Sequence, residues 1–391
     1  MKLYQFRSLK YFIIIIVSFF FLPKYSIAQS ENKTPYKFEL VNQVKTTPVK
    51  NQAKTGTCWS FATTSFIETE LIRIGKDSLI LSPMFNVRYT YPQKALNYIR
   101  YSGMANLADG GEPHDVMNVV KNYGFVPEEV YDGMKIGEEK HNHGEMDAVL
   151  KAIVETVNKN NGGKITPRWQ EVFESALNIY LGIPPEKFTY KGTQYTPKKF
   201  AESFGFNSDN YVELTSFTHH PFYSKFDLEI PDNWSKDKYY NVPIDVLMKI
   251  IDTSIESGYS VVWSGDVSEK GFSRKIGVAN VPLTEEPDSV EKKNDEAGGY
   301  PVKEMDITQE LRQQTFDNRT TTDDHSMLII GIAKDQNGTK YYYTKNSWGT
   351  KDRKYGGYWY ISDAYARFKV VSIMVNKNAI PKEIKSKLGI D

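Results

Sequence analysis

The chain has 391 residues, of which 40% are hydrophobic and 14% aromatic, and its formal net charge at pH 7 is +1. A chain of this length and composition can bury one large core or two smaller ones, which excludes intrinsic disorder and collagen-like structure. The near-neutral charge gives no electrostatic basis for binding nucleic acid, so we expect no nucleic-acid partner.

Residues 1–28 predict a secretory signal peptide. Basic residues precede an apolar run of about twelve residues, and Ala28 lies where cleavage is expected. A membrane-spanning helix needs roughly 20 apolar residues, so a retained anchor is the less favoured alternative. Cleavage would remove four basic and no acidic residues, which changes the net charge to −3. We therefore expect an exported protein, periplasmic or secreted, with no membrane span after the signal is removed.

The next segment, residues 29–135, predicts a helical half. Apolar residues recur at helical spacing from Cys58 to a glycine stop at Gly75, so Cys58 lies at or near a helix N-terminus. A second helix is expected to begin near Pro113, after the loop that contains Gly110 and Gly111.

Residues 136–241 predict a separate, mainly helical insertion. Apolar stripes at helical spacing cover 146–157 and 169–181. Both stripes are typical of core-facing helices.

Residues 242–391 predict a β-rich half. A helix from Pro243 to Gly258 precedes a strand, and the charged stretch 285–299 is expected to form a solvated loop. Further on, Asn337-Gly338 is typical of a hairpin turn between two apolar strands. Helices in the first part and strands in the last predict an α+β protein with two halves.

Cys58 is the one cysteine of the chain, so it cannot form a disulfide within it. An odd cysteine in an exported protein is a reactive thiol, an intermolecular link or a buried small hydrophobic residue. A helix N-terminus stabilises a thiolate, but by only about 0.3–1 kcal/mol, so a reactive Cys58 needs a charged partner as well.

His325 is the histidine best placed to be that partner. It precedes a buried strand whose hairpin partner ends in a polar segment that contains Asn346 and Trp348. In an antiparallel hairpin the start of one strand lies beside the end of the other, so His325 and Asn346 are expected side by side. Asn346 can then orient the imidazole, and Trp348 can shield the pair from water.

The other histidines have simpler interpretations. His141 and His143 match no defensible zinc motif and are expected in a solvated loop. His219 and His220 are expected on a surface turn, whereas His114 could face substrate. We therefore predict no metal ion and no cofactor. Gln52, six positions before Cys58, is a candidate donor to an oxyanion, together with the backbone N–H of Cys58.

Four segments of the chain resemble papain-like cysteine peptidases. Residues 48–62 resemble the nucleophile segment, residues 324–327 the histidine segment and residues 345–349 the asparagine segment, in the family's chain order. Gly110 and Gly111 look like the loop whose backbone pairs with substrate.

The spacing favours one branch of that family. Papain-like enzymes ordinarily place the histidine roughly 130–150 residues after the cysteine. Here His325 follows Cys58 by 267 positions, and such an insertion is typical of the bleomycin hydrolase and aminopeptidase C branch. Residues 181–189 and 242–245 continue the resemblance.

The resemblance implies a papain-like two-half fold, helical on one side and β-barrel-like on the other, with the active site between the halves. It assigns Cys58 to nucleophilic attack, His325 to general base and acid, Asn346 to orienting the base and Gln52 to the oxyanion hole. Peptide or protein substrates are implied, contacted by Gly110, Gly111 and Trp348.

Two features depart from the branch. Its members are usually intracellular aminopeptidases that form hexamers and close the cleft with a C-terminal arm. This chain has a predicted signal peptide and ends soon after residue 384, where relatives continue into the arm. The expected activity is therefore that of an aminopeptidase or, given the missing arm, of an endopeptidase. A homo-oligomer is implied by the resemblance only. The alternatives are a catalytically silent peptide-binding protein on the same fold and a transferase that uses the same acyl-enzyme.

Overall fold

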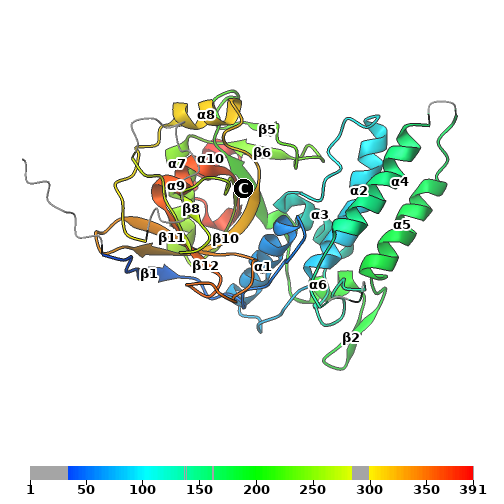
Figure 1. The fold of residues 1–391 in the computed structure, drawn as a ribbon. Coiled ribbons are helices and arrows are strands. Elements are labelled where there is room, and N and C mark those ends of the chain that lie inside the picture. Colours follow the sequence, from blue (N-terminus) through cyan, green and yellow to red (C-terminus); the bar gives the residue numbers. More distant parts are fainter. Residues whose placement is uncertain (1–33, 136, 138, 161–162, 284–298, 391) are drawn as a thin grey trace, which may run out of the picture. The chain divides into compact units, whose positions relative to one another are not determined.

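The computed structural model describes residues 34–135, 137, 139–160, 163–283 and 299–390 (Figure 1). The predicted signal peptide, residues 1–28, and nearly all of the predicted charged loop, residues 285–299, lie outside these ranges. Within them, no helix combines the length and the apolar character needed to cross a membrane.

The first part of the chain is helical, and further helices flank the later strands. The α-helices are α1 (Cys58–Arg73), α2 (Pro83–Arg100), α3 (Pro113–Tyr123), α4 (Gly144–Asn158), α5 (Arg168–Leu181), α6 (Pro197–Ser203), α7 (Ile244–Glu256), α8 (Gln309–Asp317), α9 (Asp363–Lys369) and α10 (Lys382–Leu388).

The strands are mostly short, apart from those near the C-terminus. They are β1 (Glu39–Gln43), β2 (Phe188–Tyr190), β3 (Thr193–Tyr195), β4 (Tyr211–Thr215), β5 (Lys225–Asp227), β6 (Lys238–Asn241), β7 (Val261–Gly265), β8 (Phe272–Ser273), β9 (Val278–Ala279), β10 (His325–Lys334), β11 (Lys340–Lys345), β12 (Tyr358–Ser362) and β13 (Val370–Asn376).

Helix α1 begins at Cys58, where the sequence predicts a helix N-terminus. It contacts α2 and α3 on one side and strands β7 and β10 on the other. Because α1 lies between helices and sheet, its side chains are buried on nearly all faces: 13 of its 16 residues, including Glu68 and Glu70, are buried. Cys58, the first residue of α1, is therefore held at the boundary between the helices and the sheet.

Helix α2 was absent from the sequence-based expectation. Its start does carry a signal, because Ser82 caps the helix by accepting a hydrogen bond from the Phe85 N–H and Pro83 occupies the first turn. The apolar period is obscured by Pro92 inside the helix and by polar residues such as Lys94 on the buried face. Because polar side chains are buried in α2, its hydrophobicity pattern does not predict a helix.

Most of the strands form one 11-stranded sheet within the described residues, in the order β5-β6-β4-β13-β7-β10-β11-β12-β9-β8, with β1 paired to β10. Strands β5 and β8, at the two ends of this order, do not pair with each other, so the sheet is no closed barrel. It is a mixed sheet, because β4 pairs with β6 and β12 pairs with β9 in parallel. The hairpin of β10 and β11 lies at its centre, joined by the predicted turn at residues 337–338.

Residues 136–241 hold both helices and strands. The predicted helices are present as α4 and α5, which pack on each other and on α2 (Figure 1). Strands β4, β5 and β6, however, belong to the large sheet, since β4 pairs with β13 and with β6. The segment is therefore not separate from the C-terminal half, because its last 31 residues, 211–241, contain strands that contribute to the same core.

Candidate active site

The segment before α1 brings Gln52 and Cys58 to the edge of the sheet. The N–H of Gln52 donates to the Ser347 carbonyl at 2.8 Å, and Asn51 forms an isolated antiparallel bridge with Trp348. The N–H of Gly56 donates to Asp109 Oδ2 at 2.6 Å. A side chain on Gly56 would collide with that carboxylate, since an added Cβ would lie 2.2 Å from Oδ2. The loop is thus held on both sides of the cleft.

His325 and Asn346 lie side by side, as the hairpin geometry predicts. His325 is the first residue of β10, and Asn346 follows the last residue of β11. His325 Nε2 is 2.8 Å from Asn346 Oδ1, which also accepts the Ser347 N–H at 2.7 Å. An oxygen that accepts from a backbone N–H fixes the amide orientation, so Nε2 carries the ring proton and Nδ1 keeps the lone pair that a base needs.

Trp348 covers this pair. Its ring lies against the His325 ring with centroids 4.6 Å apart and planes at 32°. The Arg274 guanidinium lies on the Trp348 ring at 4.7 Å from its centroid. The predicted shielding role of Trp348 therefore has a structural basis, because the indole separates the imidazole from solvent on that side.

The Cys58 sulfur contacts the sheet next to His325. Burial raises the pKa of its thiol, and the backbone N–H groups of Ser326 and Trp59, which lie near the sulfur, oppose that rise. Ser326 follows His325 directly, and Cys58 and His325 line the same cleft from a helix and a strand. These are the two elements that the sequence predicts to carry them.

One cleft of about 880 Å³ contains most of the predicted site residues. Cys58, His325, Gln52, Gly110 and Trp348 all line it. The remaining two predicted residues, Asn346 and Gly111, do not.

Asn346 lies behind His325, with 3% of its surface exposed. Gly111 packs against the Trp59 ring, where an added Cβ would lie 3.0 Å from the indole. The cleft also exposes charged side chains that the sequence did not single out: Lys54, Asp109, Lys140, Asp232, Arg274, Asp324 and Arg353.

Burial shifts both reacting groups towards their neutral forms. Desolvation raises the pKa of the Cys58 thiol to about 12, although the N–H groups of Ser326 and Trp59 oppose the shift. Desolvation lowers the pKa of His325 to about 4, with the Asn346 hydrogen bond opposing the shift. Burial alone thus favours the neutral form of each group, and an ion pair of the two depends on their attraction for each other.

Gln52 is held so that one amide hydrogen remains available. Its Oε1 accepts from Ser347 Oγ at 2.5 Å, and its Nε2 donates to the Thr55 carbonyl at 2.8 Å. An amide nitrogen has two hydrogens, so the second can point into the cleft that Gln52 lines. The side chain is 5% exposed, which makes its position rigid.

Lys94 of α2 holds the Gly110 loop from behind. Its ammonium group donates to the carbonyls of Ala108 and Gly110, and the residue is 1% exposed. Helix α2, which the apolar pattern does not predict, therefore positions the Gly110 loop, which is predicted to contact substrate.

Lys345, next to Asn346, connects the two walls of the cleft. Its ammonium group donates to Thr47 Oγ1 at 2.9 Å and to Ser65 Oγ of α1 at 2.6 Å. Thr47 in turn donates to Glu68, which is fully buried in α1 and pairs with Lys50 at 3.2 Å. The nucleophile helix and the strand that ends at Asn346 thus share one buried polar network.

Two expectations about histidines are corrected. His141 and His143 are buried rather than solvated, at 8% and 3% exposure. Their backbone pairs with Lys54 on both sides, which folds them behind the nucleophile segment, and the Phe61 ring contacts His141 edge-on. His114 does not line the cleft; it bonds Glu213 at 2.7 Å and Ser235 at 3.0 Å.

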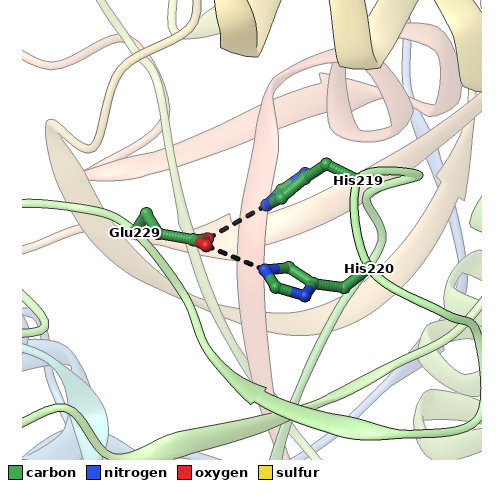
Figure 2. A group of neighbouring side chains, drawn as sticks. All are labelled: His219, His220 and Glu229. Atoms are coloured by element: carbon green, nitrogen blue, oxygen red, sulfur yellow. Dashed lines mark hydrogen bonds and ion pairs between the residues drawn. The ribbon is translucent and has the colours of Figure 1, made fainter.

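His219 and His220 lie on a surface turn, as expected, and both face Glu229 (Figure 2). Their Nε2 atoms are 3.0 and 2.8 Å from the two carboxylate oxygens of Glu229. Gln313 Nε2 donates to His219 Nδ1 at 3.0 Å, so the proton of His219 lies on Nε2, which donates to Glu229. The three residues therefore satisfy one another by hydrogen bonds, and His219 presents no Nε2 lone pair to a metal ion.

The chain is similar to known cysteine peptidases over most of its length. It is 24% identical to the mitochondrial cysteine proteinase 1 of Saccharomyces cerevisiae, over 94% of this chain and 81% of the yeast protein. It is 23% identical to human bleomycin hydrolase, over 86% of this chain and 82% of that protein. With aminopeptidase C of Listeria monocytogenes it shares 23% identity, over 88% and 83% of the two chains.

A solved structure shows the same fold. The crystal structure of PepW from Lactobacillus rhamnosis superimposes with a TM-score of 0.67 at 19% identity, over 90% of this chain and 84% of that chain. Residues 97–390 match the model of the Peptidase C1-like family, a range that includes His325 and Asn346 and begins after Cys58. With its α+β, papain-like fold, the chain belongs to the Peptidase C1-like family, in the branch of bleomycin hydrolase and aminopeptidase C.

Proposed function

We propose that this protein is an exported cysteine peptidase that hydrolyses peptide bonds through a thioester on Cys58. The observation that carries the proposal is that Cys58, near the Ser326 N–H, lines the same cleft as His325, whose imidazole is bonded to Asn346. A nucleophile, a base and a group that orients the base are the parts that acyl transfer requires.

In the proposed reaction, His325 Nδ1 takes the Cys58 proton while the sulfur bonds to the substrate carbonyl carbon. The oxygen of the tetrahedral intermediate gains the charge, and the Gln52 amide and the Cys58 N–H stabilise it. When the C–N bond breaks, His325 gives the proton to the leaving amine. Water, deprotonated by the same ring, then attacks the thioester, and the acid and the thiol are released.

The test is cleavage of a fluorogenic dipeptide amide by purified residues 29–391 in reductant, with Cys58→Ala as the control. Release of the fluorophore by the wild type alone supports the proposal. Binding of the peptide by the wild type without release would instead favour the silent peptide-binding alternative. Product analysis with an added amine would reveal transfer in place of hydrolysis.

The same assay separates the two kinds of peptidase activity. Each dipeptide is offered with a free and with a blocked N-terminus. Cleavage restricted to the free form means an aminopeptidase, which is what the name of the Listeria relative describes. Cleavage of the blocked form as well means that the cleft accepts longer chains.

Export is proposed from the first 28 residues alone. Cell fractionation followed by N-terminal sequencing tests it. A mature chain that begins at Gln29 outside the cytoplasm supports the proposal, and an uncleaved cytoplasmic chain contradicts it.

A further inference from the structure

A bound peptide would extend in two directions from Cys58, with its leaving amine on one side and its acyl part on the other. The leaving amine must lie beside His325, because that ring supplies the proton that the amine takes. Trp348 and Arg274 are on this side, stacked in sequence on the His325 ring. The acyl part of a bound peptide therefore extends the other way from Cys58, towards Gly110 and Asp232, which line the same cleft.

Asp232 presents a carboxylate oxygen directly over the Gly110 backbone. A Cβ built on Gly110 would lie 2.0 Å from Asp232 Oδ2, so the oxygen occupies the space of a missing side chain. Oδ1 accepts a hydrogen bond from Asn106 Nδ2 at 2.8 Å. Among the residues that the structure describes, no donor is bonded to Oδ2. One oxygen is thus fixed by the protein and the other remains available in the cleft.

Two further carboxyl groups, those of Glu112 and Asp323, lie next to Asp232. Glu112 is 1% exposed, and its carboxyl group is hydrogen-bonded to that of Asp323. The two side chains contact each other, and Asp323 accepts a hydrogen bond from the Asp232 backbone. Burial raises the pKa of both groups, and a neighbouring carboxylate adds to the rise, Asp323 for Glu112 and Asp232 for Asp323.

The described part of the chain supplies no ion pair to these three carboxyl groups. The charge of Lys94 acts on Asp232, but its ammonium group donates to the Ala108 and Gly110 carbonyls and forms no ion pair with the carboxylate. Asp232 therefore lines the cleft without a salt-bridge partner among the described residues, and a cation bound with the substrate would supply one.

We propose that Asp232 binds a positively charged nitrogen on the acyl side of the substrate, and so selects peptides that carry one there. This inference rests on the proposed peptidase function and adds a substrate class to it. Two parts of a substrate carry such a nitrogen. One is a free α-amino group, and the other is the side chain of Lys or Arg in the second residue before the scissile bond.

Four dipeptide coumarin amides separate these sources. All have Leu next to the scissile bond. The preceding residue is Arg or its neutral isostere citrulline, and its amino group is free or acetylated. The ratio of kcat/KM to that of the neutral acetyl-citrulline probe is measured for wild type, for Asp232→Asn and for Asp227→Asn, an exposed control on β5. Thermal unfolding followed by circular dichroism verifies that each variant is folded.

We expect the wild type to favour at least one singly charged probe about 10- to 100-fold, the range of a hydrogen bond to a charged group. In Asp232→Asn this ratio should fall close to one, and in Asp227→Asn it should stay at the wild-type value. Preference for free citrulline identifies the amino terminus as the ligand; preference for acetyl-arginine identifies the side chain.

Wild-type ratios near one, or ratios unchanged in Asp232→Asn, would overturn the inference and leave the peptidase function intact. If the wild type cleaves no probe, the peptidase function fails instead. The affinities of the same four probes for Cys58→Ala protein and for Cys58→Ala/Asp232→Asn protein, measured by calorimetry, then decide the role of Asp232 without turnover.

Discussion

The two walls of the cleft are built from different kinds of structure. On the sheet wall, backbone register places His325 beside Asn346, so the geometry of the base follows from one hairpin. On the helix wall, Cys58, Gln52 and Gly110 come from a helix end and two loops, held by polar contacts with distant residues such as Asp109 and Lys94. The base is thus positioned by contacts within one hairpin, whereas the nucleophile and the Gly110 loop depend on contacts with residues far away in the sequence.

The largest expected effect comes from removing the reacting group of either wall. His325→Ala and Cys58→Ala should each lower kcat by about 10⁴-fold or more, and the double variant should lose little beyond that, since the two groups act as one unit. Steady-state cleavage of the fluorogenic dipeptide measures this. Independent, multiplicative losses would show that the walls do not work together.

A smaller effect is expected from the oxyanion donor on the helix wall. Gln52→Ala should lower kcat by about 10²- to 10³-fold with little change in KM, because the donor acts on charge that develops only in the transition state. Gln93→Ala, an exposed glutamine of α2, is the matched control. A rise in KM at constant kcat would assign Gln52 to substrate binding instead.

The connection between the walls can be broken at Lys345. Burial lowers the pKa of Lys345 to about 8, and its ammonium group is bonded to Thr47 and Ser65. Lys345→Met removes both bonds and leaves Glu68 with less compensating charge, so unfolding free energy should fall by about 1–3 kcal/mol. Urea denaturation measures it, with the exposed Lys151→Met as control. Equal stability of the two variants would contradict a structural link between the walls.

The smallest expected effect is on the pH dependence of stability, through His143 behind the helix wall. Burial and then the charge of His141 lower the pKa of His143 to about 4, below the 6.5 of an ordinary histidine. The unfolded chain therefore binds the proton first, and His143 makes the fold less stable as the pH falls from 6.5 towards 4.

The variant His143→Leu lacks this penalty. Relative to it, the wild type should lose up to about 1.4 kcal/mol of stability per pH unit in that interval. Urea denaturation of both proteins between pH 7 and 4.5 measures the difference. A constant difference across this range would mean that His143 is protonated alike in both states.

The sequence predicts the sheet wall better than the helix wall. The physical reason is the sequence separation of the contacts that position each wall. The pairing of His325 with Asn346 follows from strand periodicity and a turn within about 20 residues, and the helix start at Cys58 follows from a local apolar pattern. The burial of His141 and His143 was missed because it depends on contact with Lys54, far away in the chain.

Asp232 was missed for the same reason. It lies in no motif, and what brings it to the cleft is the packing of its loop on Asn106 and the Gly110 loop. Helix α2 is not predicted because its buried face carries Lys94 and Arg88. An apolar stripe does not mark a helix whose buried positions are polar and are hydrogen-bonded to distant partners.

The most direct test of the central claim is the mass of the protein after reaction with an epoxide that modifies catalytic thiols. Cys58 is the one cysteine of the chain, so an adduct has a single thiol to form on. We expect one adduct per folded chain, located on Cys58, lost in His325→Ala and accompanied by loss of peptide cleavage. An unmodified thiol in folded wild-type protein, or full cleavage by the modified protein, would contradict it.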